Sequence, residues 1–447
     1  MIPLVGVPQT IAKQLSAYRE VFCRAEGFEH VSRYVSGLIL SANKTLQGIY
    51  AQQVYPQGEG VSRRAMHSAV FEAGWSSEKL MTQHREIVGK KHRGVGREII
   101  SLDWTLSHHE YGLEIYGVKR SYDYVNRCMS NYQTVVTATI ANREQIDGIA
   151  AEVQLPDFSK EEKKYLQMTA QPSYQSQAEL MQRLTELLHY QQNRLAYRKR
   201  TEIAVDIVRQ VESEGAFPQA DYAFDNGVLT LELTQIIESS GKHWVSEIES
   251  SRLILWQDKW CRVDVIATQL CGEHPESFRP LQVRCRNGTV KQFWAFTKTV
   301  RLKRYGRKRL VIVHEREDLS DEPRFLLTDA LHWESGRVIQ TWSYRWTIEI
   351  FHEFAKQVTG FESAQVRNQE AVKRHFCLSC ISQSLLQSLP CQGQKSERFM
   401  FAHNQQTVGQ QLYSLTREAY LQMLHLVQGL FAQTHTCEQV LEVLMPA

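Results

Sequence analysis

The sequence predicts an α/β protein: a mixed-sheet core that is interrupted by an inserted all-β subdomain and flanked by helical regions at both ends. Three observations predict this arrangement. Apolar residues recur at helical spacing up to about residue 95, strands alternate with helices over residues 96–249, and short strand-like runs fill residues 250–335. Beyond Trp342 the spacing is helical again. The composition, 43% hydrophobic and 23% charged, is that of a globular protein.

The first region, residues 1–95, is predicted to be a helical domain. Its apolar residues, such as Val31, Val35 and Leu38, recur at intervals of three and four, which places them on one face of a helix. The region ends in a basic stretch at residues 90–93, after which the period of apolar residues changes. We therefore place a domain boundary near residue 95.

The core is predicted to comprise residues 96–249 and 336–360. Its elements form a series of three strands, a helix, a strand, a helix and a strand. In chain order we expect strands at 98–104, 113–118 and 134–140, a helical tract at 175–215, a strand at 220–224, a helix at 229–239 and a strand at 243–248. Such a series predicts one sheet with helices packed on its faces.

The inserted subdomain, residues 250–335, is expected to contain only strands. We place these strands at 253–256, 263–266, 281–284, 292–297 and 310–313, with turn signals such as Arg286-Asn287-Gly288 between them. An insertion of this length is tolerated when its ends lie close together on the scaffold. The remaining residues, 361–447, are predicted to be a helical C-terminal region.

Charge and cysteine usage narrow the class of protein. A formal net charge of only +3 means that any polyanion must be bound by a local basic patch. The first residues lack the pattern of a signal peptide, no apolar run approaches the roughly 18 residues of a membrane span, and the nine cysteines are scattered. No glycine-rich phosphate loop is present. We expect a soluble intracellular protein without a membrane partner or a nucleotide cofactor.

Three acidic residues occupy positions that suit metal-dependent chemistry. Asp103 ends the first core strand, Asp225 ends the strand at 220–224, and Glu349 lies on the helix after the insertion. If the two strands are neighbours, the aspartates meet at one sheet edge. Converging carboxylates repel one another unless cations neutralise them, and Mg²⁺ or Mn²⁺ suits such ligands. Each acid alone has a plainer interpretation as a turn former, a helix cap or a solvated residue.

The segment around Glu349 resembles the Tyr–Arg–Glu–Lys signature of bacterial DDE insertion-sequence transposases. In that signature two residues separate Tyr from Arg, three separate Arg from Glu, and six separate Glu from Lys. Arg345, Glu349 and Lys356 match these spacings, whereas Trp342 stands at the Tyr position. Glu353 is a rival to Glu349, but it breaks the spacing to both cations.

Two earlier stretches extend the resemblance over roughly residues 95–360. Asp103-Trp104-Thr105 is similar to the first aspartate block of the family, and Phe224-Asp225-Asn226-Gly227 is similar to its second. A β insertion between the second aspartate and the glutamate is also a feature of this subgroup. Asp221 is a rival for the second aspartate, but it precedes the apolar residues of its strand.

The resemblance implies a ribonuclease-H-like catalytic core in which Asp103, Asp225 and Glu349 hold two Mg²⁺ ions, which Mn²⁺ can replace. Arg345 and Lys356 would position DNA phosphates from the same helix face as Glu349. The implied activity is that of a DNA transposase, which binds the terminal inverted repeats of its mobile element, cleaves the DNA and transfers the 3′ ends into target DNA. The resemblance further implies a homodimeric synaptic complex and a nucleoid-associated location in a prokaryotic cytoplasm.

A basic segment lies within the insertion. Residues 298–309, KTVRLKRYGRKR, contain seven Lys or Arg and no acid, and the Tyr305-Gly306 turn predicts a protruding hairpin. We expect the hairpin to contact the DNA backbone, although a solvated hairpin tip is the plain alternative. The cations concerned are Lys298, Arg301, Lys303, Arg304, Arg307, Lys308 and Arg309.

Two further contacts with DNA are expected. Trp346 is a candidate for stacking on a base near the cleavage site, together with Trp294 and Trp342, although aromatic residues more often lie in the core. The helices of residues 1–95, with Arg63 and Arg64, are expected to bind the ends of the element. A plain dimerisation role for these helices is the alternative.

Two other functions remain open from the sequence. One is a transposase-derived, sequence-specific DNA-binding protein without cleavage activity. Against it, three clustered negative charges near DNA bring nothing to a protein that only binds. The other is a related nuclease that cuts DNA without strand transfer. Incubation with the flanking repeats and a divalent ion separates the three.

Overall fold

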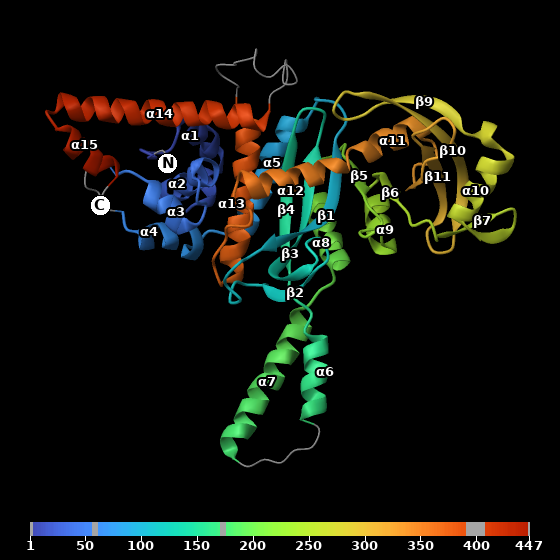
Figure 1. Ribbon diagram of the computed structural model, residues 1–447, viewed down its shortest axis with the longest axis horizontal. Helices are drawn as coiled ribbons and strands as arrows, with labels where there is room; N and C mark the ends of the chain where they lie inside the picture. The colour runs from blue at the N-terminus through green and yellow to red at the C-terminus, as the bar shows by residue number, and fades with distance from the viewer. Residues whose placement is uncertain (1–2, 56–60, 170–175, 390–406, 446–447) are drawn as a thin grey trace.

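The computed structural model describes residues 3–55, 61–169, 176–389 and 407–445. In this part of the chain, twelve strands form one mixed sheet that extends from the centre of the molecule into the insertion (Figure 1). The strands are β1 (Ile99–His108), β2 (Lys119–Asp123), β3 (Cys128–Ala141), β4 (Ile146–Gln154), β5 (Asp221–Phe224), β6 (Trp244–Glu247), β7 (Leu253–Trp256), β8 (Lys259–Arg262), β9 (Arg279–Arg284), β10 (Val290–Leu302), β11 (Gly306–His314) and β12 (Arg324–Thr328). The prediction of an α/β fold is confirmed.

The helices cover both faces of this sheet. In chain order they are α1 (Gln9–Leu15), α2 (Ala25–Leu40), α3 (Leu46–Gln52), α4 (Arg63–His67), α5 (Ser77–His92), α6 (Ser159–Met168), α7 (Gln177–Ala196), α8 (Arg200–Glu214), α9 (Leu231–Ser239), α10 (Val263–Glu273), α11 (Ser335–Ser343), α12 (Trp346–Gln357), α13 (Gln369–Gln387), α14 (Val408–Ala432) and α15 (Cys437–Leu444). Helices α5, α12 and α13 pack on the central strands from one side, and α8 and α9 pack from the other.

The central strands follow a mixed order. β1 pairs with β3 in antiparallel fashion and with β5 in parallel, and β5 continues in parallel to β6. β4 pairs antiparallel with β3 on the side away from β1. Because β1, β5 and β6 run in the same direction, their carboxyl ends lie at one edge of the sheet.

The pleat of the strands sorts their side chains between the two helical layers. Ile99 of β1 and Ala223 of β5 are buried with residues of α12 and α13, whereas Leu102 and Phe224 are buried on the opposite side with α8 and α9. Successive residues of a strand point to opposite faces, so the positions that follow Leu102 and Phe224 point toward α12. This alternation sets the direction of the acidic residues described below.

The insertion continues the central sheet, since β12 pairs antiparallel with β6 and then with β11. It is not all β, because α10 lies within it, and the prediction of a strand at 263–266 is wrong. The buried apolar residues Val263, Ile266, Ala267 and Leu270 recur at helical intervals, which a four-residue window hides. The other four strands predicted there are present as β7, β9, β10 and β11.

Two predictions in the core also need correction. Residues 113–118 form turns rather than a strand, because Gly112 and Gly117 adopt φ values of +112° and +79°, which interrupt an extended chain. The helical tract at 175–215 divides, in its described part, into α7 and α8, which meet at residues 197–199. The strands β2 and β4 and the helix α6 were not predicted. The remaining core elements are confirmed as β1, β3, β5, α9 and β6.

The two helical regions form one layer rather than lying at separate ends of the molecule. α13 packs against α2 and α5, and their apolar side chains share one buried cluster with α12 and the sheet. His375, Cys377 and Cys380 of α13 are buried in this layer. None of the helices in the described residues has the length and apolar character that crossing a membrane requires.

Candidate active site

The two predicted aspartates occupy neighbouring positions in the sheet. The last residues that pair β1 with β5 are Leu102 and Phe224. Asp103 and Asp225 come one residue later on each strand and share the pleat direction that points toward α12. The structure thus brings together two carboxylates that lie more than a hundred residues apart in the sequence.

The surroundings of the two aspartates differ from the prediction in one respect. Asp103 does not end its strand, because β1 continues to His108 through its pairing with β3. What ends at this point is β5, so that Asp225 starts a loop in which its Oδ1 accepts a hydrogen bond from the Val228 amide at 3.3 Å. The sequence shows where the apolar pattern of each strand stops. It does not show that β1 continues beyond this point while β5 ends there.

A third acid, which was not predicted, stands in the same row. Phe224 of β5 pairs with Ser246 of β6, so Glu247 follows at the register of Asp225. Burial raises the pKa of the Glu247 carboxyl, nearby Arg324 and Arg345 lower it, and Asp225 raises it further. Asp103, Asp225 and Glu247 therefore form a row across three parallel strands. Glu247 is the penultimate residue of the predicted strand 243–248, and its place beside Asp225 depends on the pairing of β6 with β5.

Helix α12 brings Glu349 to this row. Glu349 lies in the first turn of the helix, and its carboxylate forms an ion pair with Arg345, four residues earlier. The same guanidinium lies 4.0 Å from Oδ2 of Asp103. Arg345 thus stands between an acid of the sheet and an acid of the helix, and its contact with Glu349 follows the predicted four-residue spacing.

The concentration of negative charge alters the titration of Asp103. Burial, together with repulsion from Asp225 and Glu349, raises the pKa of its carboxyl from 3.8 to about 7. The backbone N–H of Trp104, which donates to Asp103 at 2.7 Å, and the charge of Arg345 lower this pKa without offsetting the rise. A nearby cation stabilises the ionised form of such a carboxyl.

The acidic side chains share one type of donor atom. Asp103, Asp225, Glu247 and Glu349 offer only carboxylate oxygens, which Mg²⁺ and Mn²⁺ prefer. In the described part of the chain, however, no three His, Cys, Asp or Glu side chains already converge on one point where an ion could be held. The positive charge between Asp103 and Glu349 is supplied by Arg345.

The second predicted cation of the helix, Lys356, contacts the same strand further along. Its Nζ donates a hydrogen bond to the Leu106 carbonyl of β1 and forms an ion pair of 3.1 Å with Glu362. Its side chain remains about one quarter exposed. Lys356 therefore links α12 to β1 beyond the acidic row, and its charge is partly compensated.

A buried histidine ties the same helix to β3. His352 lies one turn after Glu349, and its Nε2 is 2.7 Å from the hydroxyl oxygen of Thr137, which lies directly opposite Asp103 in the β1–β3 ladder. The Thr137 hydroxyl is also 3.3 Å from the Asp103 carbonyl. Burial, with a smaller effect of Lys356, lowers the pKa of His352 to about 3, so the imidazole is neutral near pH 7.

The rival acids lie outside this site. Asp221 is at the start of β5, the opposite end from Asp225, and its carboxylate accepts from the His243 amide and pairs with Arg97 at 3.5 Å. Glu353 is on α12 but is exposed to solvent. The strand-end argument for Asp225 and the spacing argument for Glu349 thus agree with the geometry.

Of the three tryptophans, Trp346 is the accessible one. Its side chain is 57% exposed, whereas Trp342 is 8% exposed and Trp294 is half-buried. Trp346 and Arg345 line a cavity of about 400 Å³ between α11, α12 and the insertion. The ring of Trp346 therefore lies beside Arg345, 6.0 Å from its guanidinium, while Trp342 packs in the core of the insertion.

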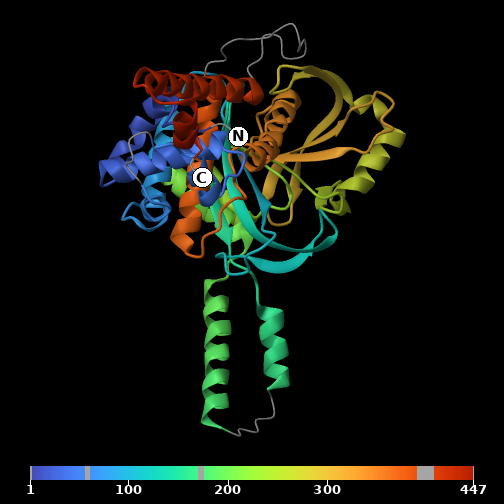
Figure 2. The same ribbon diagram turned by 60° about the vertical axis from the view of Figure 1, so that its left-hand side comes forward.

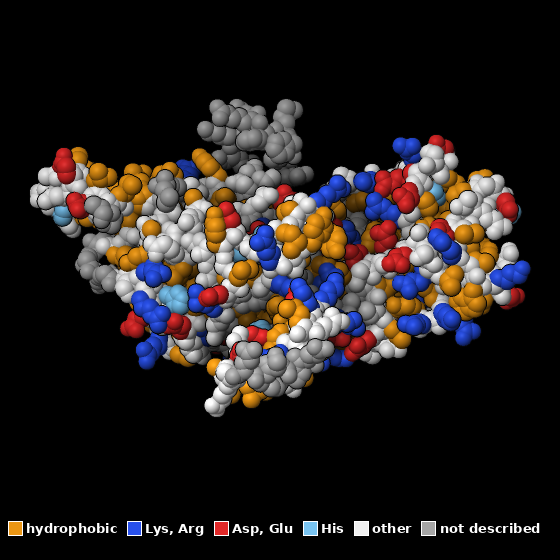
Figure 3. Space-filling model, turned by 60° about the horizontal axis from the view of Figure 1, so that its bottom comes forward, with side chains coloured by type: hydrophobic (Ala, Val, Ile, Leu, Met, Phe, Trp, Pro, Cys, Tyr) orange, Lys and Arg blue, Asp and Glu red, His pale blue; other side chains and the backbone are white. Residues whose placement is uncertain are grey.

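The basic segment forms the predicted hairpin between β10 and β11, in the part of the molecule where Lys and Arg side chains are spread over the insertion (Figure 3). Arg301, Lys303, Arg304 and Arg307 are exposed. Lys298 lies 4.0 Å from the ring centroid of Trp256. Near the hairpin tip, Arg252 stacks with Tyr305 at 6.0 Å and donates to Asn226, the neighbour of Asp225, at 3.4 Å.

Two cations of the hairpin have other partners. Lys308 is buried, and its Nζ forms an ion pair of 2.9 Å with Glu238. Arg309 is half-buried and donates to the Leu331 carbonyl at 2.7 Å. The structure therefore places Lys308 away from any surface contact. Alternation along β11 explains the difference, because every second side chain must point into the core.

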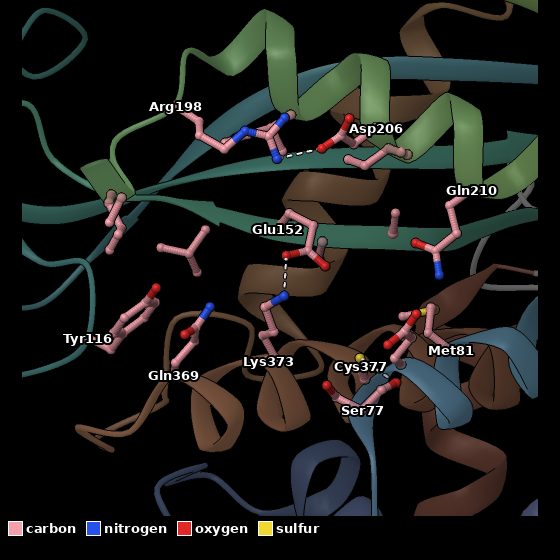
Figure 4. Close-up of a pocket in the computed structure, with 18 of the residues that line it drawn as sticks. Ser77, Met81, Tyr116, Glu152, Arg198, Asp206, Gln210, Gln369, Lys373 and Cys377 are labelled. Carbon is pink, nitrogen blue, oxygen red and sulfur yellow. Dashed lines mark hydrogen bonds and ion pairs between the residues drawn. The ribbon is translucent and has the colours of Figure 1, made fainter. Parts of the chain in front are cut away.

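A separate polar cavity of about 460 Å³ lies between β4, α5, α8 and α13 (Figure 4). Its charges are paired: Lys373 contacts Glu152 at 2.8 Å, and Arg198 forms an ion pair with Asp206. Glu152 and Lys373 lie within the cavity and face each other in the close-up (Figure 4). Because these charges neutralise one another, the cavity indicates no ligand class, and the acidic row is the better candidate site.

Comparison with known proteins adds no family to this geometry. The chain matches no protein-family model and no curated protein.

Proposed function

We propose that this protein is a DNA transposase of the DDE type with a ribonuclease-H-like core. The order of the central sheet supports this core: β4, β3 and β1 are antiparallel neighbours, and β5 and β6 extend the sheet in parallel with β1. Asp103, Asp225 and Glu349 are its catalytic acids, and Glu247 stands beside them. The proposed reaction is cleavage at the ends of a mobile element and transfer of the 3′ ends into target DNA.

One observation carries the proposal. The transposase signature singles out Asp103, Asp225 and Glu349 from distant segments. The fold brings Asp103 and Glu349 to the guanidinium of Arg345, and it places Asp225 at the end of the neighbouring strand, close enough to raise the pKa of Asp103. The pKa of Asp103 is raised by burial first and then by repulsion from Asp225 and Glu349, and such shifts are common at catalytic sites.

The residues present fit two Mg²⁺ ions in donor type and in charge. Asp103 and Asp225 would hold one ion, and Asp103 with Glu349 would hold the other. The ions, when bound, would activate a water or a 3′-hydroxyl and stabilise the leaving oxygen. Arg345 would bind the phosphate beside the scissile bond, while Lys356 keeps α12 on β1.

The hairpin between β10 and β11 supports DNA as the partner. Arg301 lies directly opposite Arg307 in the antiparallel ladder. Like charges in this position destabilise a strand pair, and a polyanion removes the penalty. The proposed contact with the DNA backbone is therefore formed by Arg301, Lys303, Arg304 and Arg307. Lys308 takes no part in it, because it is buried and paired with Glu238.

The test is incubation of the purified protein with DNA that carries the repeats flanking its coding region, in Mg²⁺ or Mn²⁺. We expect nicking at the repeat ends and joining to a target plasmid, both lost in Asp103→Asn. Asp221→Asn, at the other end of β5, is the matched control and should retain activity. Specific binding without cleavage would instead favour a DNA-binding protein, and cleavage without joining would favour a nuclease.

A further inference from the structure

Helices α6 and α7 form an arm that projects from the body of the molecule (Figures 1 and 2). In the described residues of these two helices, no side chain is buried. α7 alone has 20 residues, a length of about 30 Å. Two helices without a core are marginal in water, so an arm of this length needs apolar contacts that the described residues of the single chain do not provide.

One face of α7 is occupied by α6. The rings of Tyr165 and Tyr190 lie 5.5 Å apart, and Arg194 forms an ion pair of 2.6 Å with Glu162. On α6 the same face carries Phe158 just before the helix, 6.2 Å from the ring of His189. The residues of α7 that meet α6 are thus polar or aromatic.

The opposite face of α7 carries an apolar seam. Its residues follow the intervals of three and four that define positions a and d of a coiled coil: Met181, Leu184, Leu188, Gln191 and Leu195. At 100° per residue they cluster within about 80° of the helix surface, away from Tyr190 and Arg194. The exposed fractions are 57% for Met181, 51% for Leu184, 53% for Leu188 and 79% for Leu195.

We propose that this seam pairs with the same seam of a second copy of this chain, so that two arms form a coiled coil. The seam contains no Asp, Glu, Lys or Arg, and it therefore meets its own copy without repulsion between like charges. A two-fold interface needs only one self-complementary surface on each chain. The heptad spacing favours a second α7 helix as the partner of the seam. DNA is disfavoured there because its phosphates bind Lys and Arg side chains, which the seam lacks.

The pairing would also place two acidic sites in one assembly. The arm returns to the body at Arg200, whose guanidinium lies 4.1 Å from the ring of Trp104, the neighbour of Asp103. Two paired arms therefore bring the two points at which the arms join the body close to a common axis. The interface itself does not depend on the proposed activity.

The oligomeric state of the full chain tests the proposal without DNA or metal. Sedimentation velocity over about 1 to 100 μM should show a concentration-dependent dimer for the wild type. The double variant Leu184→Glu/Leu188→Glu should raise the dimer dissociation constant by at least about 100-fold, because four carboxylates would enter an apolar seam. Gln182→Glu/Asn193→Asp, which adds the same charge to α7 outside the seam, should dimerise like the wild type.

A cross-link supplies a second measurement. Leu188 lies at the centre of the seam, seven residues from both Met181 and Leu195, so it comes close to its own copy in a parallel and in an antiparallel pair. Leu188→Cys should form a disulfide-linked dimer under mild oxidation, and Gln182→Cys should not. A wild type that stays monomeric throughout this range, or a Leu184→Glu/Leu188→Glu variant that dimerises equally well, would overturn the proposal. If the wild type is monomeric and Leu184→Glu/Leu188→Glu lowers its DNA affinity, the seam binds DNA instead.

Discussion

Asp103 lies beside Asp225 because each follows the last residue that pairs β1 with β5. The relation depends on the parallel register of two short segments, and it fixes both carboxylates on the face toward α12. One residue of slip would turn one of them into the opposite helical layer. The acidic site is thus as well defined as the strand register beneath it.

The row of acids predicts a role for Glu247. Glu247→Gln removes a charge at the register next to Asp225, and we expect the rate of metal-dependent cleavage to fall by about 10- to 100-fold. Initial rates at saturating DNA and varied Mg²⁺ measure the change. Glu322→Gln, a nearby but exposed acid, is the matched control. Equal rates for both variants would exclude Glu247 from the site.

The titration of Asp103 predicts a dependence of stability on pH. Its folded-state pKa of about 7 exceeds the ordinary 3.8, so the folded protein binds the proton more tightly than the unfolded chain. This stabilising contribution is complete below about pH 4 and is lost as the pH rises through 7. Asp103→Asn resembles the neutral acid and should therefore be more stable than the wild type at pH 8, by roughly 1 to 3 kcal/mol.

Urea unfolding in EDTA at pH 5 and pH 8 checks this sign. The stability gained by Asp103→Asn should be larger at pH 8 than at pH 5. Asp221→Asn, whose carboxylate is paired with Arg97, should show no such gain. A gain of equal size at both pH values would mean that Asp103 titrates normally.

The contact between His352 and Thr137 predicts a positioning effect on α12. Thr137→Val keeps the shape of the side chain but removes the hydroxyl that joins His352 to the Asp103 carbonyl. We expect a loss of about 1 kcal/mol in stability and a several-fold lower cleavage rate, with DNA affinity unchanged. Thr137→Ser restores the hydroxyl and should restore the rate. If Val and Ser behave alike, the hydroxyl has no positioning role.

The hairpin predicts a change in the salt dependence of DNA binding. Replacing Arg301, Lys303 and Arg307 with Gln should reduce the slope of log K against log salt by about 0.9 for each DNA phosphate that the variant no longer neutralises. Fluorescence anisotropy between about 50 and 300 mM salt measures the slope. Neutralising the exposed Lys160, Lys163 and Lys164 of α6 is the matched control. An unchanged slope would remove the hairpin from the interface.

Much of the core could be predicted from the sequence because its signals are local. The strands β5 and β6 and the helix α9 show short apolar runs or helical periodicity, and the structure confirms them. The strand predictions at 113–118 and 263–266 were wrong for different reasons. Glycines with positive φ interrupt the first segment, and the second is the start of a helix whose period four residues are too few to reveal. A window of four to six residues distinguishes neither case.

The site shows the same division. Arg345 and Glu349 are four residues apart on one helix, so their contact could be predicted from spacing. Glu247 was missed, because its place beside Asp225 comes from the register of β6 against β5. The burial of Lys308, in turn, depends on which face of β11 packs on the core.

By itself, the sequence determined the α/β class, the helical spacing of the cations and acid on α12, and the basic hairpin, because each follows from the period of residues within a single element. Only the tertiary structure decided that the insertion extends the central sheet, that three acids share one row, and that α7 presents an apolar face that the other described residues leave exposed. These are relations between segments far apart in the chain. They depend on strand register and on which surfaces remain uncovered, and neither is encoded in local spacing.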